Sequence, residues 1–431
     1  MRADLTAPGH GDVQLGLRGR LVTGLAGQEV IGDGTVLVAG GTIAWCGPTA
    51  ELPAGVDVET TRVPLILPGL VDVHCHGAVG HTFSADADGA RRAAGYHAGQ
   101  GTTSVLASLV SAPSQVLLEQ IAVLRELVQD GTLAGLHLEG PFIAKNMCGA
   151  QDPAAIIDGD PALLQEWLEA GQGTVRSITL APETPHFAEL VSLCRKYGVV
   201  PSLGHTDATA SRTRDALGRG GAGGESDGGP WSATHLFNRM PPLGHRAPGP
   251  IPVLLQAARQ APGQMVLELV ADGVHLDPEI VRMVFGLVGP GSIALITDAM
   301  AAAGMSDGRY TLGSLDVLVQ DRVARLVPGE GDAGPGAIAG ATSLLLENVR
   351  RCVEWGVPLA DAVTAASATP ARLMGLDRPG SDKPGSDKVG VLAAGYRADV
   401  LVTTEELELV QAYRAGTPLT QERKTRADYS V

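Results

Sequence analysis

Four histidines and two carboxylates stand at or close to the ends of apolar segments. They are His74 and His76 in VDVHCHG, Glu139 in HLEGPF, His205 in GHTDA, His235 in THLFN and Asp298 in LITDAM. Imidazole nitrogens and carboxylate oxygens are ligands of Zn²⁺ and similar divalent ions. His74 and His76 are two residues apart, so on an extended strand they point to the same side. A single histidine in a strand is more often a hydrogen-bonded core residue, but the six together predict a metal site.

The elements that must position these residues alternate between strand and helix. Helical patterns such as APSQVLLEQIAVLRELVQD separate most of eight apolar runs, at 65–73, 102–110, 133–138, 175–180, 199–204, 231–237, 265–271 and 292–297. Eight such repeats in roughly 250 residues are what a (β/α)₈ barrel of the TIM type needs. A doubly wound open sheet is the alternative. In a barrel, the carboxyl ends of the strands share one face, which would bring the six residues together.

The two ends of the chain differ from this pattern. Residues 13–63 and the stretch VGVLAAGYRADVLVTT read as short strands broken by glycine. We expect both ends to combine into one small β-sandwich domain, with boundaries at 1–63, 64–377 for the barrel, and 378–431 for a linker and the last strands. Three segments rich in Gly or Pro, 218–230, 327–337 and 378–388, are expected to be loops or linkers without chemistry.

Composition limits the classes of function. A hydrophobic fraction of 44% is enough for a globular core, and a net charge of −15 argues against nucleic acid as a partner, because binding it requires a basic track along the phosphates. An anionic substrate would then need a local cation. Five scattered cysteines without a CxxC pair suit a reducing compartment. Because no signal peptide and no apolar run of ~20 residues is found, we expect a cytoplasmic protein without membrane contact.

Two further residues lie close to the predicted ligands in sequence. Cys75 separates His74 from His76, so it should point away from them and act as a small buried hydrophobe. His137 shares a side of its strand with Glu139; it either supports the site or is structural. Cys148 lies in a loop rather than at a strand end, which makes it a weak candidate for a metal ligand.

The order of the motifs gives the chain a narrower identity. PGLVDVHCHG, HLEGPF, GHTDA, THLFNRMPPL, ADGVHLD, ITDAM and GVLAAGYRADVLV follow one another as in the N-acetylglucosamine-6-phosphate deacetylases of the amidohydrolase superfamily, which the chain resembles from about Leu17 to about Thr403. The HxH pair and the final GYRADVLV block indicate only the superfamily. HLEGPF followed by THLFN and DGVH is similar to this deacetylase family in particular.

The resemblance implies roles for individual residues. Glu139, His205 and His235 correspond to the principal metal ligands, and Asp298 to the catalytic acid and base. The positions that correspond to substrate contacts are Ala150, Gln151, Asn238, Arg239, His275, Ile338, Ala339 and Gly340. Arg246, in GHRAPG, corresponds to an arginine that reaches the sugar phosphate of the neighbouring subunit. A homodimer is therefore implied.

Two departures from the family pattern affect these expectations. The family loop after HLEGPF often ends in Gly-Ala-His, whereas this chain has Gln151 in place of the histidine. Glutamine donates a hydrogen bond but carries no proton or charge. Some relatives lack His74 and His76 and bind one metal ion; their presence here favours two ions, with Asp298 as an extra ligand. Zn²⁺ is the first expectation for the ion, with Fe²⁺, Mn²⁺ or Co²⁺ as alternatives, and one or two ions per chain.

The activity implied by the resemblance is metal-dependent hydrolysis of the acetamide of N-acetylglucosamine 6-phosphate, which yields glucosamine 6-phosphate and acetate. Asp298 would move the proton from water to the leaving amine, and a metal ion or His275 would polarise the carbonyl. Two alternatives stay open. One is a dihydroorotase-like hydrolase of another cyclic or linear amide, many of which carry a carboxylated lysine on a barrel strand. The other is a non-catalytic relative that serves as a binding module.

Overall fold

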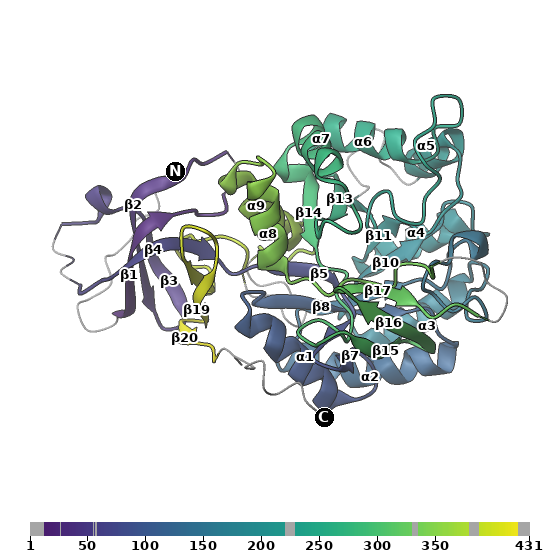
Figure 1. Cartoon of the computed structure of the whole chain (residues 1–431), viewed down its shortest axis with the longest axis horizontal. Helices are drawn as coiled ribbons and strands as arrows, with labels where there is room; N and C mark the ends of the chain where they lie inside the picture. The colour runs from purple at the N-terminus through teal and green to yellow at the C-terminus, as the bar shows by residue number, and fades with distance from the viewer. Residues whose placement is uncertain are drawn as a thin grey trace.

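The chain folds into a large α/β body with a smaller β body beside it (Figure 1). The computed structural model describes residues 13–25, 27–54, 56, 58–219, 229–329, 335–378 and 388–420. Of the three segments expected to be loops, 218–230 and 378–388 lie largely outside these residues, and 327–337 lies partly outside them. Within the described ranges, no helix is both long and apolar enough to cross a membrane.

The large body is a barrel of eight parallel strands in the order β14-β13-β12-β11-β10-β9-β8-β5. The strands are β5 (Val71–Cys75), β8 (Ser104–Val110), β9 (Gly135–Glu139), β10 (Val175–Leu180), β11 (Val200–Leu203), β12 (Trp231–Ala233), β13 (Met265–Val270) and β14 (Ile293–Ile296). Almost every residue in them is buried, as expected for a parallel sheet covered on both faces. The predicted (β/α)₈ barrel is confirmed.

Closure of the barrel between β14 and β5 depends on residues that follow β14. Asp298 N donates to the His74 carbonyl at 2.9 Å, and His76 N donates to the Ala299 carbonyl at 2.7 Å. Below them, the Thr297 hydroxyl donates to the buried Asp72 carboxylate at 2.6 Å. The first and last barrel strands are therefore joined next to the residues predicted to bind metal.

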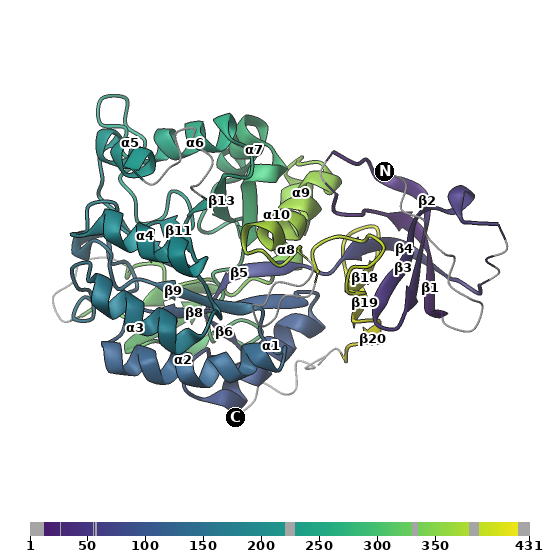
Figure 2. The same ribbon diagram turned by 180° about the vertical axis from the view of Figure 1, so that it is seen from behind.

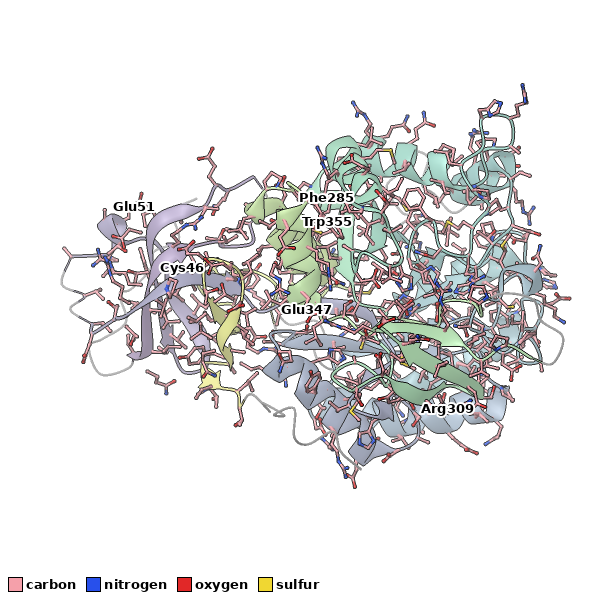
Figure 3. The ribbon with its side chains drawn as sticks, viewed as in Figure 1. Cys46, Glu51, Phe285, Arg309, Glu347 and Trp355 are labelled. Atoms are coloured by element: carbon pink, nitrogen blue, oxygen red, sulfur yellow. The ribbon has the colours of Figure 1, made fainter. Side chains whose placement is uncertain are left out.

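Helices surround the barrel (Figure 2). They are α1 (Ala87–Gly99), α2 (Ser114–Gln129), α3 (Pro161–Gly171), α4 (Phe187–Tyr197), α5 (Ala210–Arg219), α6 (Ile251–Gln260), α7 (Pro278–Val288), α8 (Leu345–Glu354), α9 (Leu359–Ala366) and α10 (Ala368–Leu373). Helix α7 shows why they form: the Asp277 carboxylate caps the N-terminus and Pro278 takes the first position. Its buried residues recur at helical spacing, namely Val281, Val284, Phe285 and Val288. Phe285 shares an apolar cluster with Trp355, which follows α8 (Figure 3).

The small body combines both ends of the chain, as predicted. Its strands form one seven-stranded sheet in the order β20-β19-β18-β4-β1-β2-β3. They are β1 (Val13–Leu21), β2 (Ile31–Ala39), β3 (Thr42–Pro48), β4 (Thr61–Pro68), β18 (Val400–Thr403), β19 (Leu409–Arg414) and β20 (Thr417–Pro418). Strand β4 pairs with β1 on one edge and with β18 on the other, so it joins the two ends. The boundary expected between residues 63 and 64 falls inside β4, because the apolar run at 65–73 is divided between β4 and β5.

One part of the structure has no counterpart in the expectations. After β14 the chain forms a three-stranded antiparallel sheet of β15 (Gly308–Leu312), β16 (Leu315–Gln320) and β17 (Val323–Leu326). Arg309, labelled in Figure 3, marks its position, far from Cys46 and Glu51 in the small body. A two-stranded ribbon, β6 (Gly77–Ala78) and β7 (His81–Thr82), follows β5.

Candidate metal centre and active site

A carboxylate and two imidazoles converge at the carboxyl ends of β9, β11 and β12. The Nε2 atoms of His205 and His235 each lie 3.0 Å from the same oxygen, Oε1 of Glu139, and 3.0 Å from one another. All three side chains are buried. The structure thus brings together the three residues that the sequence predicts as principal metal ligands.

A second group lies next to the first and shares Glu139. The Nε2 atom of His76 is 3.1 Å from Oε2 of Glu139 and 3.2 Å from the Nε2 atom of His74. Asp298 Oδ1 is 3.2 Å from the Nε2 atom of His76. One ligand atom from each of His74, His76 and Glu139 lies within 4.8 Å of the others, and the same holds for Glu139, His205 and His235. Glu139 belongs to both groups, so it would help to hold an ion in either of them.

The orientation of the imidazoles suits a cation. Three of them have the ring nitrogen Nδ1 engaged by an acceptor, which directs Nε2 toward Glu139 and fixes the ring. The pairs are His205 with the Met147 carbonyl (2.9 Å), His76 with the Ser108 carbonyl (3.0 Å) and His74 with the Glu268 carboxylate (3.1 Å). Converging imidazole nitrogens around shared carboxylates are the donor set of a divalent transition metal such as Zn²⁺. The residues present fit such an ion.

Backbone conformation at this site is unusual. His205, His235 and Asp298 have φ values of 46°, 27° and 52°, in the left-handed region that residues other than glycine rarely adopt. Each follows directly or closely on the end of a barrel strand, where the chain turns away from the sheet. Strained backbone of this kind is concentrated at functional sites, where surrounding contacts hold it.

The electrostatics of the site are dominated by the two shared carboxylates. Burial acts to raise the pKa of Asp298, but the hydrogen bond from His76 and the positive charges on His74 and His76 lower it to about 2. Burial likewise opposes ionisation of Glu139, yet its contacts with His74, His205 and His235 hold its pKa well below the usual value. Burial lowers the pKa of His76, but Asp298 and Glu139 raise it to about 9. A cation that binds here must replace protons on the imidazoles.

Asp298 and His275 face each other across the site. The Nε2 atom of His275 lies 3.9 Å from Oδ2 of Asp298. Its Nδ1 atom is 2.8 Å from the Asp272 carboxylate, which also accepts bonds from the backbone N–H of Val274 and His275. Burial lowers the pKa of His275, but the adjacent Asp272 raises it above the ordinary value. His275 is thus held as a donor directed at the cavity.

Gln151 reaches the metal site from the loop after β9. Its Nε2 atom donates to Oε2 of Glu139 at 2.6 Å, and its Oε1 atom accepts from Ser111 N at 2.6 Å. The side chain is 3% exposed. The residue that replaces the family's histidine is therefore bound to a predicted metal ligand, while it still lines the cavity.

These groups surround a cavity of about 220 Å³. Most of the predicted substrate positions line it, and so do two residues that were not predicted, Phe237 and Leu312 from β15. The lining residues are His76, Glu139, Ala150, Gln151, His205, His235, Phe237, Asn238, Arg239, His275, Asp298, Leu312, Ile338 and Gly340. His74 and Ala339 are fully buried and do not line it. Arg246 is exposed and is not among the lining residues of this chain's cavity.

Sequence reasoning missed two carboxylates that hold the imidazoles, Glu268 and Asp272. Glu268 contacts His74 and also accepts from the Ser232 hydroxyl at 2.9 Å. The signal was present in the run MVLELVAD, since a lone glutamate inside a buried strand must have a partner. His137, for which two roles were open, is buried between the hydroxyls of Ser108 and Thr179, each 2.9 Å away.

Comparisons with known proteins agree with this geometry. The chain matches the amidohydrolase family over residues 65–418. It is 30% identical over 394 residues to the N-acetylglucosamine-6-phosphate deacetylase of Bacillus subtilis, covering 89% of this chain and 92% of that one. It is 32% identical over 390 residues to the N-acetylgalactosamine-6-phosphate deacetylase of Escherichia coli O157:H7, covering 89% and 94%. A solved structure of N-acetyl-D-glucosamine-6-phosphate deacetylase from Mycobacterium smegmatis superimposes with a TM-score of 0.81 at 35% identity, covering 94% of this chain and all of that one.

Proposed function

The chain belongs to the amidohydrolase family, and on that premise we infer that it is an N-acetylglucosamine-6-phosphate deacetylase. It hydrolyses the acetamide of N-acetylglucosamine 6-phosphate to glucosamine 6-phosphate and acetate. The observation that carries this assignment is the cavity in which Asp298 and His275 face the Glu139, His205 and His235 group. Relatives that match most of the chain carry the same activity in their names.

The enzyme is metal-dependent, and Glu139, His205 and His235 would hold the principal ion. When bound, a divalent ion supplies Lewis acidity and makes water a nucleophile near neutral pH. We propose Zn²⁺ as this ion because of its preference for nitrogen ligands, with Fe²⁺, Mn²⁺ or Co²⁺ as alternatives. We also propose a second ion at His74 and His76.

The number of ions has a direct test. Fully reconstituted protein should contain close to two ions per chain by elemental analysis. Replacing both His74 and His76 with alanine should lower that number by one, because Glu139 then keeps only His205 and His235 as partners. An unchanged ratio in the double variant would show that these histidines bind no ion of their own.

Asp298 performs the proton transfers. Its pKa of about 2 keeps it ionised at neutral pH, so it accepts a proton from the attacking water. The amine leaves only after protonation, and Asp298 is placed to return the proton to it. His275, held by Asp272, donates a hydrogen bond toward the oxygen on which negative charge develops.

The sugar and its phosphate need contacts beyond the reacting amide. Asn238 and Arg239 line the cavity with His235, and so do Ile338 and Gly340. We propose that Arg246, exposed on the loop after β12, binds the phosphate of the neighbouring subunit in a homodimer. Its planar guanidinium suits the bidentate contact that phosphate accepts. A cytoplasmic location remains the expectation, in line with five cysteines that form no disulfide.

The alternatives from the sequence have less support. The described barrel strands contain no lysine, so none of them can supply the carboxylated lysine of many cyclic-amide hydrolases. A non-catalytic relative would have no need of the complete ligand set and Asp298. The similarity to an N-acetylgalactosamine-6-phosphate deacetylase raises the question of which sugar is the better substrate. N-acetylglucosamine 6-phosphate and N-acetylgalactosamine 6-phosphate differ only in the configuration of one sugar hydroxyl.

An activity panel on metal-reconstituted enzyme tests the assignment. It includes N-acetylglucosamine 6-phosphate, N-acetylgalactosamine 6-phosphate, unphosphorylated N-acetylglucosamine and dihydroorotate. We expect the highest kcat/KM for N-acetylglucosamine 6-phosphate. A higher value for N-acetylgalactosamine 6-phosphate would reassign the sugar within the same chemistry. Hydrolysis of dihydroorotate alone would overturn the proposal.

A further inference from the structure

A second cavity, of about 390 Å³, lies at the opposite end of the barrel strands from the metal centre. It is formed where β10, β11 and β12 begin, against the segment that follows α10. Strand β11 and helix α10, both labelled in Figure 2, show where these segments lie. Val200, Leu373 and Met374 line part of it and belong to the apolar cluster that fills the base of the barrel. This cavity plays no part in the proposed reaction.

Four of its twelve lining residues are arginines: Arg176, Arg195, Arg372 and Arg378. They come from three separate parts of the fold, β10, α4 and the region in and after α10. No aspartate or glutamate occurs among the described residues that line the cavity. In a chain with 47 acidic and 32 basic residues, such a concentration of one sign of charge indicates an anionic ligand.

Arg195 is held in place but retains donors for a ligand. Its Nη1 atom donates to the Pro230 carbonyl at 2.7 Å, and its guanidinium carbon lies 5.1 Å from the ring centroid of Trp231. Its Nε and Nη2 atoms are buried and have no hydrogen-bond partner within the described part of the chain. Leaving buried charged donors unsatisfied is costly unless a ligand binds them.

The other arginines are placed around the same space. Arg372 is anchored by a 2.8 Å bond from Nη2 to the Gly291 carbonyl. Arg176 is 2% exposed, and Arg378 lies at the exposed rim. Burial lowers the pKa of both Arg176 and Arg195 to about 10, and a bound anion would oppose that change.

The backbone also accommodates Arg195. Gly229 has a φ of 47°, and a Cβ atom at that position would lie 2.8 Å from Nη1 of Arg195. A larger residue at this position would adopt a strained backbone and require the guanidinium to shift.

We propose that this cavity is a binding site for a phosphate group, either free phosphate or the phosphate of a small ester. Guanidinium groups from several directions match the oxygens of a phosphate, and each makes charge-assisted hydrogen bonds to it. The aliphatic wall of Val199, Val200, Leu373 and Met374 provides room for an organic body. The site is separate from the catalytic cavity, because the two share no lining residue.

Binding is measured on the metal-loaded full-length chain by calorimetry and by thermal unfolding, with inorganic phosphate and glucose 6-phosphate as probes. The variants are Arg195→Gln and Arg378→Gln. The control Arg282→Gln removes the same charge from an exposed arginine of α7 that does not line the cavity. In the wild type, a ligand at about 100 times its Kd should raise the melting temperature by about 3–5 °C. Either cavity variant should weaken the affinity about tenfold or more, while Arg282→Gln should leave it unchanged.

Arg378→Gln decides the outcome if Arg195→Gln fails to fold, since Arg378 is exposed and supports no buried contact named above. Tighter binding of glucose 6-phosphate than of phosphate identifies an ester as the ligand, and equal binding identifies free phosphate. The proposal is overturned if both probes bind Arg378→Gln and Arg282→Gln with equal affinity, because the cavity arginines then contribute nothing.

Discussion

Asp298 combines three properties that acid–base catalysis of amide hydrolysis requires. It is ionised at neutral pH, it lies 3.2 Å from the Nε2 atom of His76 at the edge of the metal site, and its other oxygen faces His275. Its left-handed backbone directs the carboxylate into the cavity rather than along β14. These properties make it the residue whose replacement should affect turnover most selectively.

We expect Asp298→Asn to lower kcat at least ~10²-fold, the usual contribution of a positioned acid or base. Asparagine keeps the shape of the side chain but cannot accept the proton from water. Steady-state kinetics would measure the effect, with metal content and circular dichroism as controls. A folded, metal-loaded variant with a rate close to wild type would rule out the proton-transfer role.

Gln151 is the second single residue that can be tested. It lies in the loop after β9 and donates a hydrogen bond to Oε2 of Glu139. Removing a group that orients a metal ligand usually weakens metal binding 10–100-fold. We expect Gln151→Ala to lose metal at correspondingly lower chelator concentrations. Asn146→Ala is the matched control, since Asn146 is an amide of the same loop that contacts Asp207 instead. Equal metal affinity in both variants would show that Gln151 contacts substrate only.

The sequence identified the residues that the structure brings together at the site better than it identified the contacts that hold them. His74, His76, Glu139, His205, His235 and Asp298 stand out because polar residues interrupt or follow apolar runs, and the barrel brings the ends of those runs together. The bond from Gln151 to Glu139 depends on the path of a loop, which hydrophobic periodicity does not describe. Glu268 was not predicted, because the run MVLELVA was interpreted as an apolar strand.

At the scale of elements, the contribution to stability of the hydrogen bonds that close the barrel between β14 and β5 can be tested. Thr297 donates its hydroxyl to Asp72 at 2.6 Å, and its backbone N–H also approaches that carboxylate, at 3.3 Å. Burial raises the pKa of Asp72 to about 6, above its ordinary value. The native state therefore loses stability as the pH rises through about 6 and Asp72 ionises, and the Thr297 hydroxyl limits that loss.

Thr297→Val keeps the size of the side chain and removes the donor. We expect a loss of about 1–3 kcal/mol in the free energy of unfolding. The loss should be larger at pH 8 than at pH 5, because the ionised carboxylate has the greater need of a donor. Chemical denaturation at both pH values measures it, with the exposed Thr311→Val as control. A loss that is equal at both pH values would contradict the role assigned to Asp72.

Prediction of the elements succeeded where the periodicity was long and failed where segments were short. Each of the eight barrel strands overlaps one of the eight apolar runs, and only β5 and β9 extend past the end of theirs, by two residues and one residue. Strands buried on both faces are continuously apolar, which makes them easy to find. The sheet of β15–β17 was not predicted, although Leu312 from it lines the active site. The burial of β16 alternates along the strand, but its sequence LDVLVQ does not, because the exposed Leu318 is apolar. Hydrophobic alternation therefore gave no clear signal for this strand.

At the scale of the whole molecule, the main question is how an acidic protein binds a phosphorylated sugar. With a net charge of −15, the enzyme repels its substrate at long range, so binding depends on local cations. Arg246 is exposed and lies outside the cavity of its own chain. This position is compatible with a role in the site of a second subunit.

We expect Arg246→Ala to raise KM for N-acetylglucosamine 6-phosphate roughly ten- to hundredfold, the effect of one charge-assisted hydrogen bond. The KM for unphosphorylated N-acetylglucosamine should change little, and this comparison serves as the internal control.

Mixing Arg246→Ala chains with Asp298→Asn chains tests action across a dimer. In a mixed dimer, one site would lack both groups and the other would be intact, so activity should partly return. If subunit exchange is demonstrated and activity does not return, Arg246 acts in its own chain or not at all.

The central position of β4 in the small sheet has a consequence for synthesis on the ribosome. Leu67 of β4 pairs with Leu401 of β18, about 330 residues later in the chain. At roughly 5–20 residues per second, translation takes roughly 15–65 s to cover that interval. During this time β4 has an unpaired edge, which is a template for association with other chains. We expect nascent chains to be prone to association until the last strands emerge, and premature termination before β18 to leave an aggregation-prone product.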